Sequence, residues 1–280
     1  MIIGVDVGAY VTKGVIMKGR SIIKSISTPT EDPIESTSRT IKILLENTGA
    51  KDAVSIVAVT GGGSRRLGEK IGDISVVKVD ELQAIGIGGL TLAEKLEGLI
   101  VNVGTGTAMV AAYNEGRRVT HVGGTGVGGG TLLGLSERML GIRRFEELEA
   151  AAGKGRAERV DLTVRDIVGG PIGIVPAEAT ASNFGRLCAE ATVEDVAAGL
   201  FNMVCQVIGV LGAMAAKAYR LEDGVIVTGG LPRSRLAAGI IEETMSLFGI
   251  NPVIPKDCEY CTAVGAARSL RILSSNRMDV

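Results

Sequence analysis

Four glycine-rich turns, each directly after an apolar run, constrain the fold of this chain more than any other feature. Glycine loses more backbone entropy on folding than any other residue, so such turns indicate backbone that must approach another group closely. Backbone N–H groups exposed in turns of this kind form concave anion-binding sites. Four of them favour a nucleotide cleft over four ordinary tight turns. The turns are DVGAYVTK (6–13), VGTGT (103–107), GGTGVGGGT (123–131) and TGGL (228–231).

The apolar runs around these turns occur twice in the same arrangement. Residues 2–28 predict three strands at hairpin spacing with a glycine turn after the first, and residues 98–126 repeat the pattern. This repetition predicts an α/β fold made of a duplicated domain, with a cleft between the halves. We place the halves at residues 1–95 and 96–261, and expect a closing helix over 262–280 to pack back on the first half.

Further apolar patterns predict helices over most of residues 128–220 and a short strand over 251–255. Within the helical part, residues 196–216 carry no charge and could span a bilayer by length. Asn202 and Gln206, frequent small residues and the lack of a preceding positive flank favour a helix buried in a soluble protein or at a subunit interface. A transmembrane helix is the less favoured interpretation.

The composition narrows the class of partner. The 280 residues have a formal net charge of −1, and only 3% are aromatic. A nucleic-acid partner is therefore not expected, because neither a basic stripe nor stacking surfaces are visible. The start MIIGVDVG does not have the features of a signal peptide, so we expect a cytoplasmic protein with reduced cysteines and no membrane partner.

Some charged residues beside the turns could perform phosphoryl transfer. Asp6 could position Mg²⁺ through water, and Lys13 could neutralise phosphate charge. The alternatives are an exposed turn acid and an ordinary lysine at a strand edge. Asp80 and Glu81 open a predicted helix, where the helix dipole favours any carboxylate. One of the two could instead take the proton from a hydroxyl, and the pattern alone does not choose between them.

The order of the motifs along residues 2–272 resembles the type II pantothenate kinases, within the sugar kinase, heat-shock ATPase and actin superfamily. The resemblance rests most strongly on the long glycine motif followed by FEEL and DLTVRDIVGG. The matching motifs are VDELQA, VNVGTGT, GGTGVGGGTLLGLS, FEELEAAAGKG, VDLTVRDIVGG, ASNFG and AVGAA.

The resemblance implies duplicated ribonuclease H-like (actin-like ATPase) domains and the use of ATP and Mg²⁺. It implies phosphorylation of pantothenate to 4′-phosphopantothenate, the first step of coenzyme A biosynthesis, by a homodimer joined through the helical second half. It places Glu81 at the catalytic base, Asp6 at the metal and Thr105 at both nucleotide and substrate. The positions that it assigns to nucleotide binding are Asp6, Gly8, Lys13, Thr105, Gly128, Gly129, Gly130, Thr131, Phe145 and Gly230.

The chain departs from the family pattern at the first turn and near the substrate. Ala9 and Tyr10 replace Gly-Thr, and His121 stands where the family has an arginine that contacts pantothenate. His121 either contacts the substrate or is a strand-end residue without a ligand. Arg117 or Arg118 could replace the missing charge if the turn shifts.

Three alternatives stay open: a kinase of the same fold for another small hydroxy compound, an ATPase of the kind that activates 2-hydroxyacyl-CoA dehydratases, and a nucleotide-binding protein without catalysis. The VGTGT turn has no cysteine after it, which argues against the iron–sulfur activators.

Overall fold

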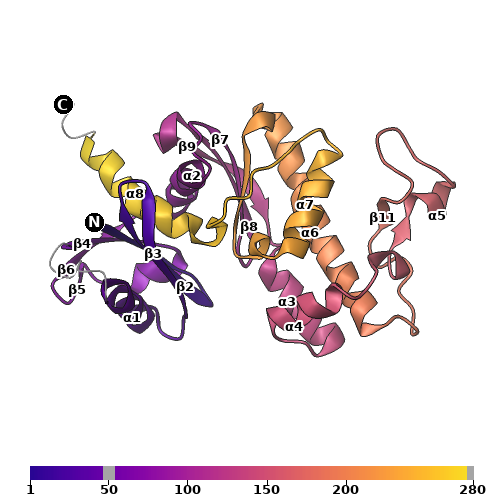
Figure 1. Ribbon diagram of the computed structural model, residues 1–280, viewed down its shortest axis with the longest axis horizontal. Coiled ribbons are helices and arrows are strands. Elements are labelled where there is room, and N and C mark those ends of the chain that lie inside the picture. The colour runs from indigo at the N-terminus through magenta and orange to yellow at the C-terminus, as the bar shows by residue number, and fades with distance from the viewer. Residues whose placement is uncertain (47–53, 276–280) are drawn as a thin grey trace.

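The computed structural model describes residues 1–46 and 54–275. It contains two mixed sheets, separated by a pair of helices, and a helical layer on the outer side of the second sheet (Figure 1).

The first sheet has the strand order β3-β2-β1-β4-β6-β5. The strands β1, β2 and β3 form an antiparallel meander, and β4 and β6 continue the sheet in parallel with β1. Helix α1 packs against β2 and β3. The elements are β1 (Ile2–Val7), β2 (Val11–Lys18), β3 (Ser21–Pro29), α1 (Pro33–Leu45), β4 (Ile56–Thr60), β5 (Lys70–Ile71) and β6 (Ile74–Lys78).

The second sheet repeats this topology. Its order is β12-β7-β8-β9, with β7, β8 and β9 antiparallel and β12 parallel to β7. The four strands thus correspond to β4, β1, β2 and β3 of the first sheet. The predicted duplicated α/β fold is confirmed. The strands are β7 (Gly98–Val103), β8 (Thr107–Tyr113), β9 (Arg118–Thr125) and β12 (Val225–Gly229).

Helices α2 (Glu81–Leu92) and α8 (Cys261–Ser275) pack against each other between the two sheets. Their backbones touch so closely that a Cβ added at Gly88 would overlap the carbonyl oxygen of Cys261, and one added at Gly265 would overlap that of Ala84. Any side chain there would push the helices apart. The glycines of AIGIGG and AVGAA therefore hold the pair together.

Each helix of this pair also packs against one of the two sheets. Helix α2 buries Ile85 and Leu90 against the second sheet, whereas α8 lies against β1 and β4 of the first. The division of the chain at residue 95 stays a prediction. Residues 276–280 of the expected closing helix lie outside the described residues.

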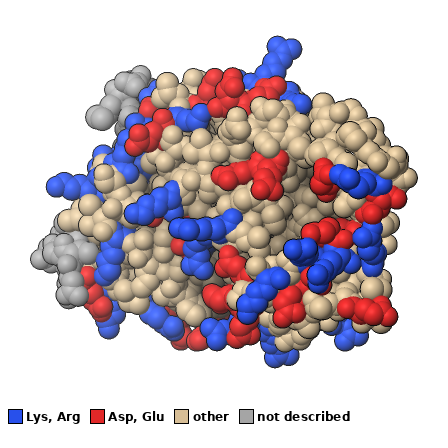
Figure 2. Space-filling model, turned by 45° about the vertical axis from the view of Figure 1, so that its right-hand side comes forward, with Lys and Arg blue, Asp and Glu red and all other residues tan. Residues whose placement is uncertain are grey.

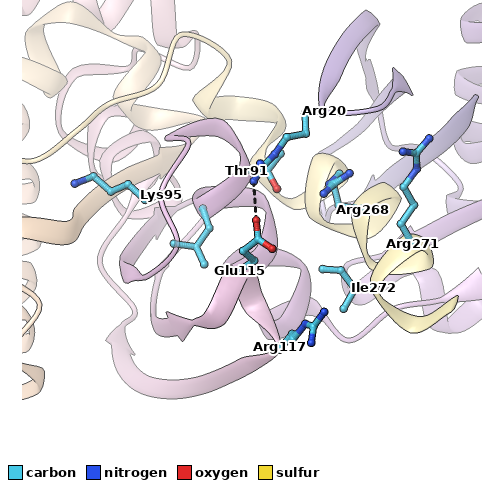
Figure 3. Close-up of a pocket in the computed structure, with 9 residues that line it drawn as sticks. Arg20, Thr91, Lys95, Glu115, Arg117, Arg268, Arg271 and Ile272 are labelled. Atoms are coloured by element: carbon cyan, nitrogen blue, oxygen red, sulfur yellow. Dashed lines mark hydrogen bonds and ion pairs between the residues drawn. The ribbon is translucent and has the colours of Figure 1, made fainter. Parts of the chain in front are cut away.

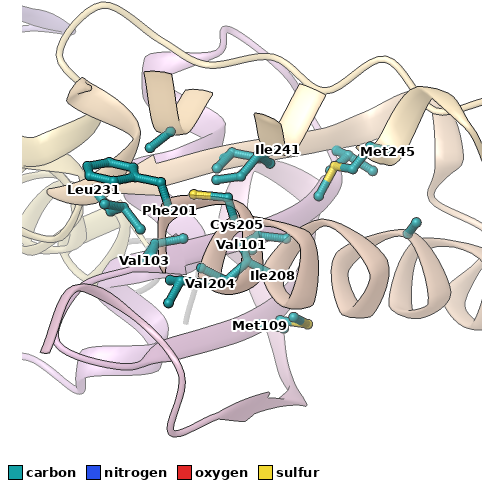
Figure 4. Packing of buried hydrophobic residues seen from close by; sticks show 14 of the residues in the cluster. Val101, Val103, Met109, Phe201, Val204, Cys205, Ile208, Leu231, Ile241 and Met245 are labelled. Carbon is teal, nitrogen blue, oxygen red and sulfur yellow. The ribbon is translucent and has the colours of Figure 1, made fainter. Parts of the chain in front are cut away.

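Helix α6 (Val193–Tyr219) crosses the second sheet and fills its core (Figure 4). Phe201, Cys205 and Ile208 are fully buried against Val101 and the helices behind them. The helix is long and apolar enough to cross a membrane by length and composition alone, but 67% of its most apolar stretch is buried inside the protein. The prediction of a helix buried on most sides is confirmed.

The second half confirms one expectation and corrects another: helices occupy most of residues 128–220, as predicted, but the strand expected near residue 253 is not formed. The helices are interrupted over residues 153–192, which contain the five-residue helix α5, a 3₁₀ turn at Ala157–Arg159 and a two-stranded ribbon, in an arm that extends away from the second sheet (Figure 1). Residues 251–255 form no strand, only a single bridge between Val253 and Ile226. The remaining elements are α3 (Gly129–Leu140), α4 (Phe145–Ala152), β10 (Leu162–Thr163), α5 (Val164–Val168), β11 (Thr180–Ser182) and α7 (Arg235–Ser246).

Candidate functional site

A cleft of about 1010 Å³ lies where the first strands of the two sheets end, and both halves line it. It brings together most of the residues predicted from the sequence. Glu81, Asp6, Gly8, Lys13, Thr105, Gly129, Gly130, Phe145 and Gly230 line it, whereas Gly128, Thr131 and His121 do not.

Asp6 and Lys13 face each other across the β1–β2 hairpin, where their Cα atoms are paired in register. The Lys13 ammonium reaches the second half: a Cβ added to Gly230 would lie 3.5 Å from its Nζ. On the other side of Asp6, a Cβ at Gly61 would lie 2.5 Å from its Oδ1. The Asp6 carboxylate therefore has the Lys13 ammonium on one side and the backbone of Gly61 on the other.

Burial raises the pKa of Asp6 to about 6, an effect that Lys13 opposes and that the nearby Glu81 carboxylate increases. A carboxyl with this pKa is mostly ionised at neutral pH, but its charge is incompletely compensated by the protein. Such a group favours an additional cation. The part of the chain that the structure describes has no cluster of three or more His, Cys, Asp or Glu side chains that could hold a metal.

Glu81 is the first residue of α2 and follows the helix cap. Asp80 makes that cap, because its Oδ1 accepts a hydrogen bond from the backbone N–H of Gln83 at 3.0 Å. The Glu81 side chain is exposed to the cleft, yet the cleft walls remove part of its water. This desolvation and the Asp80 carboxylate raise the pKa of Glu81, and Arg65 lowers it. The two carboxylates thus have different surroundings: Asp80 caps a helix, and Glu81 lines the cleft.

The long glycine run docks the start of α3 onto the VGTGT turn. The N–H groups of Gly129 and Gly130 donate to the carbonyl oxygens of Gly104 and Thr105, both at 2.9 Å. A Cβ at Gly128 would lie 2.7 Å from the Thr105 carbonyl oxygen. The run is therefore rich in glycine because two backbone segments touch there.

This contact occupies part of the N–H groups that the sequence suggested as donors to phosphate, and the role of the run in nucleotide binding stays a prediction. Two of its N–H groups are already used, and that of Gly128 donates to Thr131 Oγ1 at 3.2 Å. Thr131 Oγ1 in turn donates to the carbonyl oxygen of Gly126 at 3.0 Å. Gly128 and Thr131 thus build the loop and do not line the cleft.

Phe145 connects the cleft to the core of the second half. It begins α4, lines the cleft, and packs its ring against the buried ring of Phe201 at a centroid distance of 5.8 Å. An aromatic face anchored in this way is a firm wall for a flat ligand such as a nucleobase.

Known proteins support the family suggested by the motifs. A model of the family described as Fumble matches residues 93–266, more than half of the chain. The chain belongs to the Fumble family. Similar curated relatives are named type II pantothenate kinase. They come from Bacillus thuringiensis subsp. konkukian (30% identity; 77% of this chain and 82% of the relative), a strain of Bacillus cereus (28%; 94% and 95%) and Staphylococcus haemolyticus (27%; 95% and 98%).

Solved structures with the same fold include proteins of different activities. One is the activator of the 2-hydroxyisocaproyl-CoA dehydratase from Clostridium difficile with bound ADPNP (TM-score 0.68, 20% identity, 100% of this chain and 97% of that one). Another is a ROK family glucokinase from Streptomyces griseus in complex with glucose and AMPPNP (TM-score 0.61, 14% identity, 97% and 99%). At these identities they establish the actin-like ATPase fold of this Fumble-family chain, not its reaction.

The structure does not bring His121 into the cleft. It is exposed on β9, paired with Val110, and its role as a substrate contact stays a prediction. The two arginines upstream do not replace it there, because Arg117 lines a different pocket and Arg118 stacks on the ring of Tyr113 at 4.1 Å. The cations that the second half does place along the cleft are Arg143 and Arg233.

The departures at the first turn do not close the cleft. Tyr10 lines it but is 72% exposed, so most of its bulk faces solvent. Its carbonyl oxygen accepts a hydrogen bond from the N–H of Thr30 at 2.9 Å, which fixes the turn. The turn requires glycine at position 8, because a Cβ on Gly8 would lie 2.7 Å from the Val11 carbonyl oxygen.

Several cleft residues of this Fumble-family chain were missed from the sequence. Gly61 and Gly62 follow the apolar strand β4, the same signal that singled out the other four turns. Asn102 is a polar residue inside the apolar strand β7, and its Oδ1 accepts a hydrogen bond from Thr228 Oγ1 at 3.0 Å. Arg143 carries no sequence signal, because it pairs with Glu137 only once α3 has formed.

Replacing Asp6 by asparagine is expected to stabilise the ligand-free protein at neutral pH. Because the folded-state pKa of about 6 lies above the unfolded value of 3.8, stability falls as the pH rises through that window. We expect Asp6→Asn to raise the free energy of unfolding at pH 7.5 by on the order of 2 kcal/mol, and the gain to vanish near pH 4. Urea unfolding at both pH values measures this.

The exposed Asp73→Asn is the charge-matched control, and its unfolding free energy should stay within about 0.5 kcal/mol of the unaltered protein. If Asp6→Asn is no more stable than the unaltered protein at pH 7.5, Asp6 is not held in an unfavourable environment.

Proposed function

We propose that this chain transfers the γ-phosphoryl group of ATP to the primary hydroxyl of pantothenate, giving 4′-phosphopantothenate. The observation that carries the proposal is the position of Glu81, in the cleft between the two halves and close enough to Asp6 to raise its pKa. The type II pantothenate kinases that resemble this chain over nearly its whole length support pantothenate as the acceptor.

In this proposal Glu81 is the general base. Its raised pKa makes it a better proton acceptor than an ordinary carboxylate. The proton of the acceptor hydroxyl goes to a carboxylate oxygen of Glu81 as the oxygen attacks the γ-phosphorus. The bond between that phosphorus and the bridging oxygen of ADP breaks, and ADP leaves with the electron pair.

Lys13 and the turns would hold the phosphates. The Lys13 ammonium lies against Gly230, where it can neutralise charge on the phosphates from the side of the first half. The VGTGT turn, held in place by Gly129 and Gly130, presents the Thr105 hydroxyl from the other side. Phe145 is positioned for the base of the nucleotide.

Asp6 is the residue that would hold Mg²⁺. In nucleotide sites this ion is bound by one or two carboxylates together with water and substrate phosphates, so a single desolvated carboxylate whose charge is incompletely compensated fits it. When bound, the ion neutralises charge on the transferring phosphoryl group. Without it, Asp6 and Glu81 repel each other across the cleft.

We further propose a cytoplasmic homodimer, with the subunits joined through the second half. Exposed apolar side chains on α6 and on the arm formed by residues 153–192 support such a contact, among them Met214, Ile167 and Ile174. Figure 2 shows lysines and arginines mixed with acidic residues over the visible face, without a basic stripe. This supports a small-molecule acceptor and not a nucleic acid as the partner.

The acceptor is tested by ADP release from Mg·ATP with pantothenate, pantoate, pantetheine and a few sugars. We expect pantothenate to stimulate ADP release at least tenfold over the acceptor-free rate, since the hydroxyl must displace water as the attacking group. Stimulation only by another hydroxy compound would assign the scaffold to a different acceptor. Equal ADP release with and without every acceptor would make the protein an ATPase.

A further inference from the structure

A second pocket, of about 310 Å³, lies at the opposite end of α2 from Glu81 (Figure 3). Four segments form it: the β2–β3 hairpin, the end of α2, the β8–β9 hairpin and α8. The hairpins belong to different sheets, so the pocket, like the cleft, is shared by the two halves. Thr91, which lines the pocket, follows Glu81 by ten residues along α2, a separation of about 15 Å at 1.5 Å per residue.

Positive charge dominates this pocket. Five cationic side chains and one carboxylate line it. The carboxylate, Glu115, lies 3.4 Å from Arg20 of the other half, and both side chains are about half exposed. Lys95 donates to the backbone carbonyl of Asp223 at 2.8 Å, which leaves its charge uncompensated. The cations are Arg20, Lys95, Arg117, Arg268 and Arg271.

Arg268 is the most constrained of these cations. Its Nε is buried and has no hydrogen-bond partner among the described residues, and its Nη1 makes only a 3.5 Å contact with the carbonyl oxygen of Gly19. Burial lowers the pKa of Arg268, and the nearby Arg20 and Arg271 lower it further. Guanidinium groups held close together in this way are stabilised by an anion that can accept from several of them.

The rest of the lining indicates what kind of anion fits. Thr91 adds a hydroxyl at the end of α2, and Leu90 and Ile272 provide an apolar side. The volume exceeds that of a single inorganic ion, so an organic group has room beside the charged one. A phosphate monoester carries nearly two negative charges and three acceptor oxygens, so it can accept from several of these cations at once, which favours it over a monocarboxylate.

We propose that this pocket is a second, separate binding site, and that it takes a small organic molecule carrying a phosphate group. The ligand's phosphate contacts Arg268 and Arg117, and its organic part lies against Leu90 and Ile272. At about 15 Å from Glu81 the molecule takes no part in the chemistry of the cleft. It touches hairpins of both halves and thus acts at the junction between them.

The test is calorimetric titration with inorganic pyrophosphate, without divalent cations, in a Lys13→Ala background that weakens phosphate binding in the cleft. Arg117→Ala is expected to weaken binding about 10- to 100-fold through loss of a charge-assisted hydrogen bond. Glu115→Gln should bind several-fold more tightly, because it removes the only carboxylate of the pocket. Arg118 is next to Arg117 in the chain but does not line the pocket, so Arg118→Ala should leave binding unchanged.

The opposite signs expected for Arg117→Ala and Glu115→Gln separate a binding effect from a folding defect. Absence of binding in the Lys13→Ala background at millimolar pyrophosphate, or equal affinity in Arg117→Ala and its parent, overturns the proposal. The titration does not require kinase turnover, so its result is independent of whether the proposed function is correct.

Discussion

Replacing Glu81 by glutamine is expected to lower kcat by about 100- to 10,000-fold, the range typical for removal of a general base. Glutamine keeps the shape of the side chain and its place at the start of α2 but cannot accept the proton. The Kd for ATP should change little, because Glu81 is assigned to the acceptor and not to the nucleotide. Single-turnover kinetics and a nucleotide-binding titration measure the two quantities separately.

The control is Asp80→Asn. Asparagine caps helices as well as aspartate does, so the hydrogen bond to the Gln83 N–H is kept. We expect this variant to keep kcat within about threefold, since only the electrostatic influence of Asp80 on Glu81 is lost. A large loss in Asp80→Asn together with normal turnover in Glu81→Gln would assign the base to Asp80.

Replacing Gly128 by alanine is expected to destabilise the protein by about 1–3 kcal/mol and to raise the KM for ATP. The φ angle of Gly128 is −177°, which any residue adopts, so the cost is steric. The new Cβ would lie 2.7 Å from the Thr105 carbonyl oxygen and 2.8 Å from the Gly106 Cα, and backbone on that side cannot rotate away. Urea unfolding and initial rates against ATP concentration test both effects.

Gly126→Ala provides a matched control two residues away. A Cβ there meets nothing within 4 Å, and the carbonyl that accepts from Thr131 Oγ1 is unaffected. Its stability and KM should stay close to those of the unaltered protein. If Gly128→Ala behaves like Gly126→Ala, the glycine run is not required by its contact with the VGTGT turn.

The duplicated fold could be predicted because each half begins with the same local pattern. Strands joined at hairpin spacing pair with their neighbours, so β1–β3 and β7–β9 follow from the chain itself. The addition of β12 beside β7 depends on a pairing across more than a hundred residues, which no local pattern specifies. The arm at 153–192 also lacked a periodic signal that would separate it from the helices around it.

The candidate site was predicted in position more accurately than in detail. Turns that follow apolar strands meet at one edge of a sheet, and this brought Asp6, Thr105 and Gly230 into one cleft. The sequence does not reveal which N–H groups remain free, because the partners of Gly129 and Gly130 lie on another turn. The basic pocket could not be predicted for a similar reason, because its arginines are scattered along the chain from position 20 to position 271.

The central claim is that phosphate passes from ATP to the primary hydroxyl of pantothenate. The most direct measurement is ³¹P NMR of the protein with Mg·ATP and pantothenate. The account predicts a new phosphate monoester signal, split into a triplet by the two protons of the adjacent CH₂ group, that grows in step with ADP and grows at least about 100-fold more slowly with Glu81→Gln. Growth of inorganic phosphate alone, or a spectrum in which ATP persists unchanged, would contradict it.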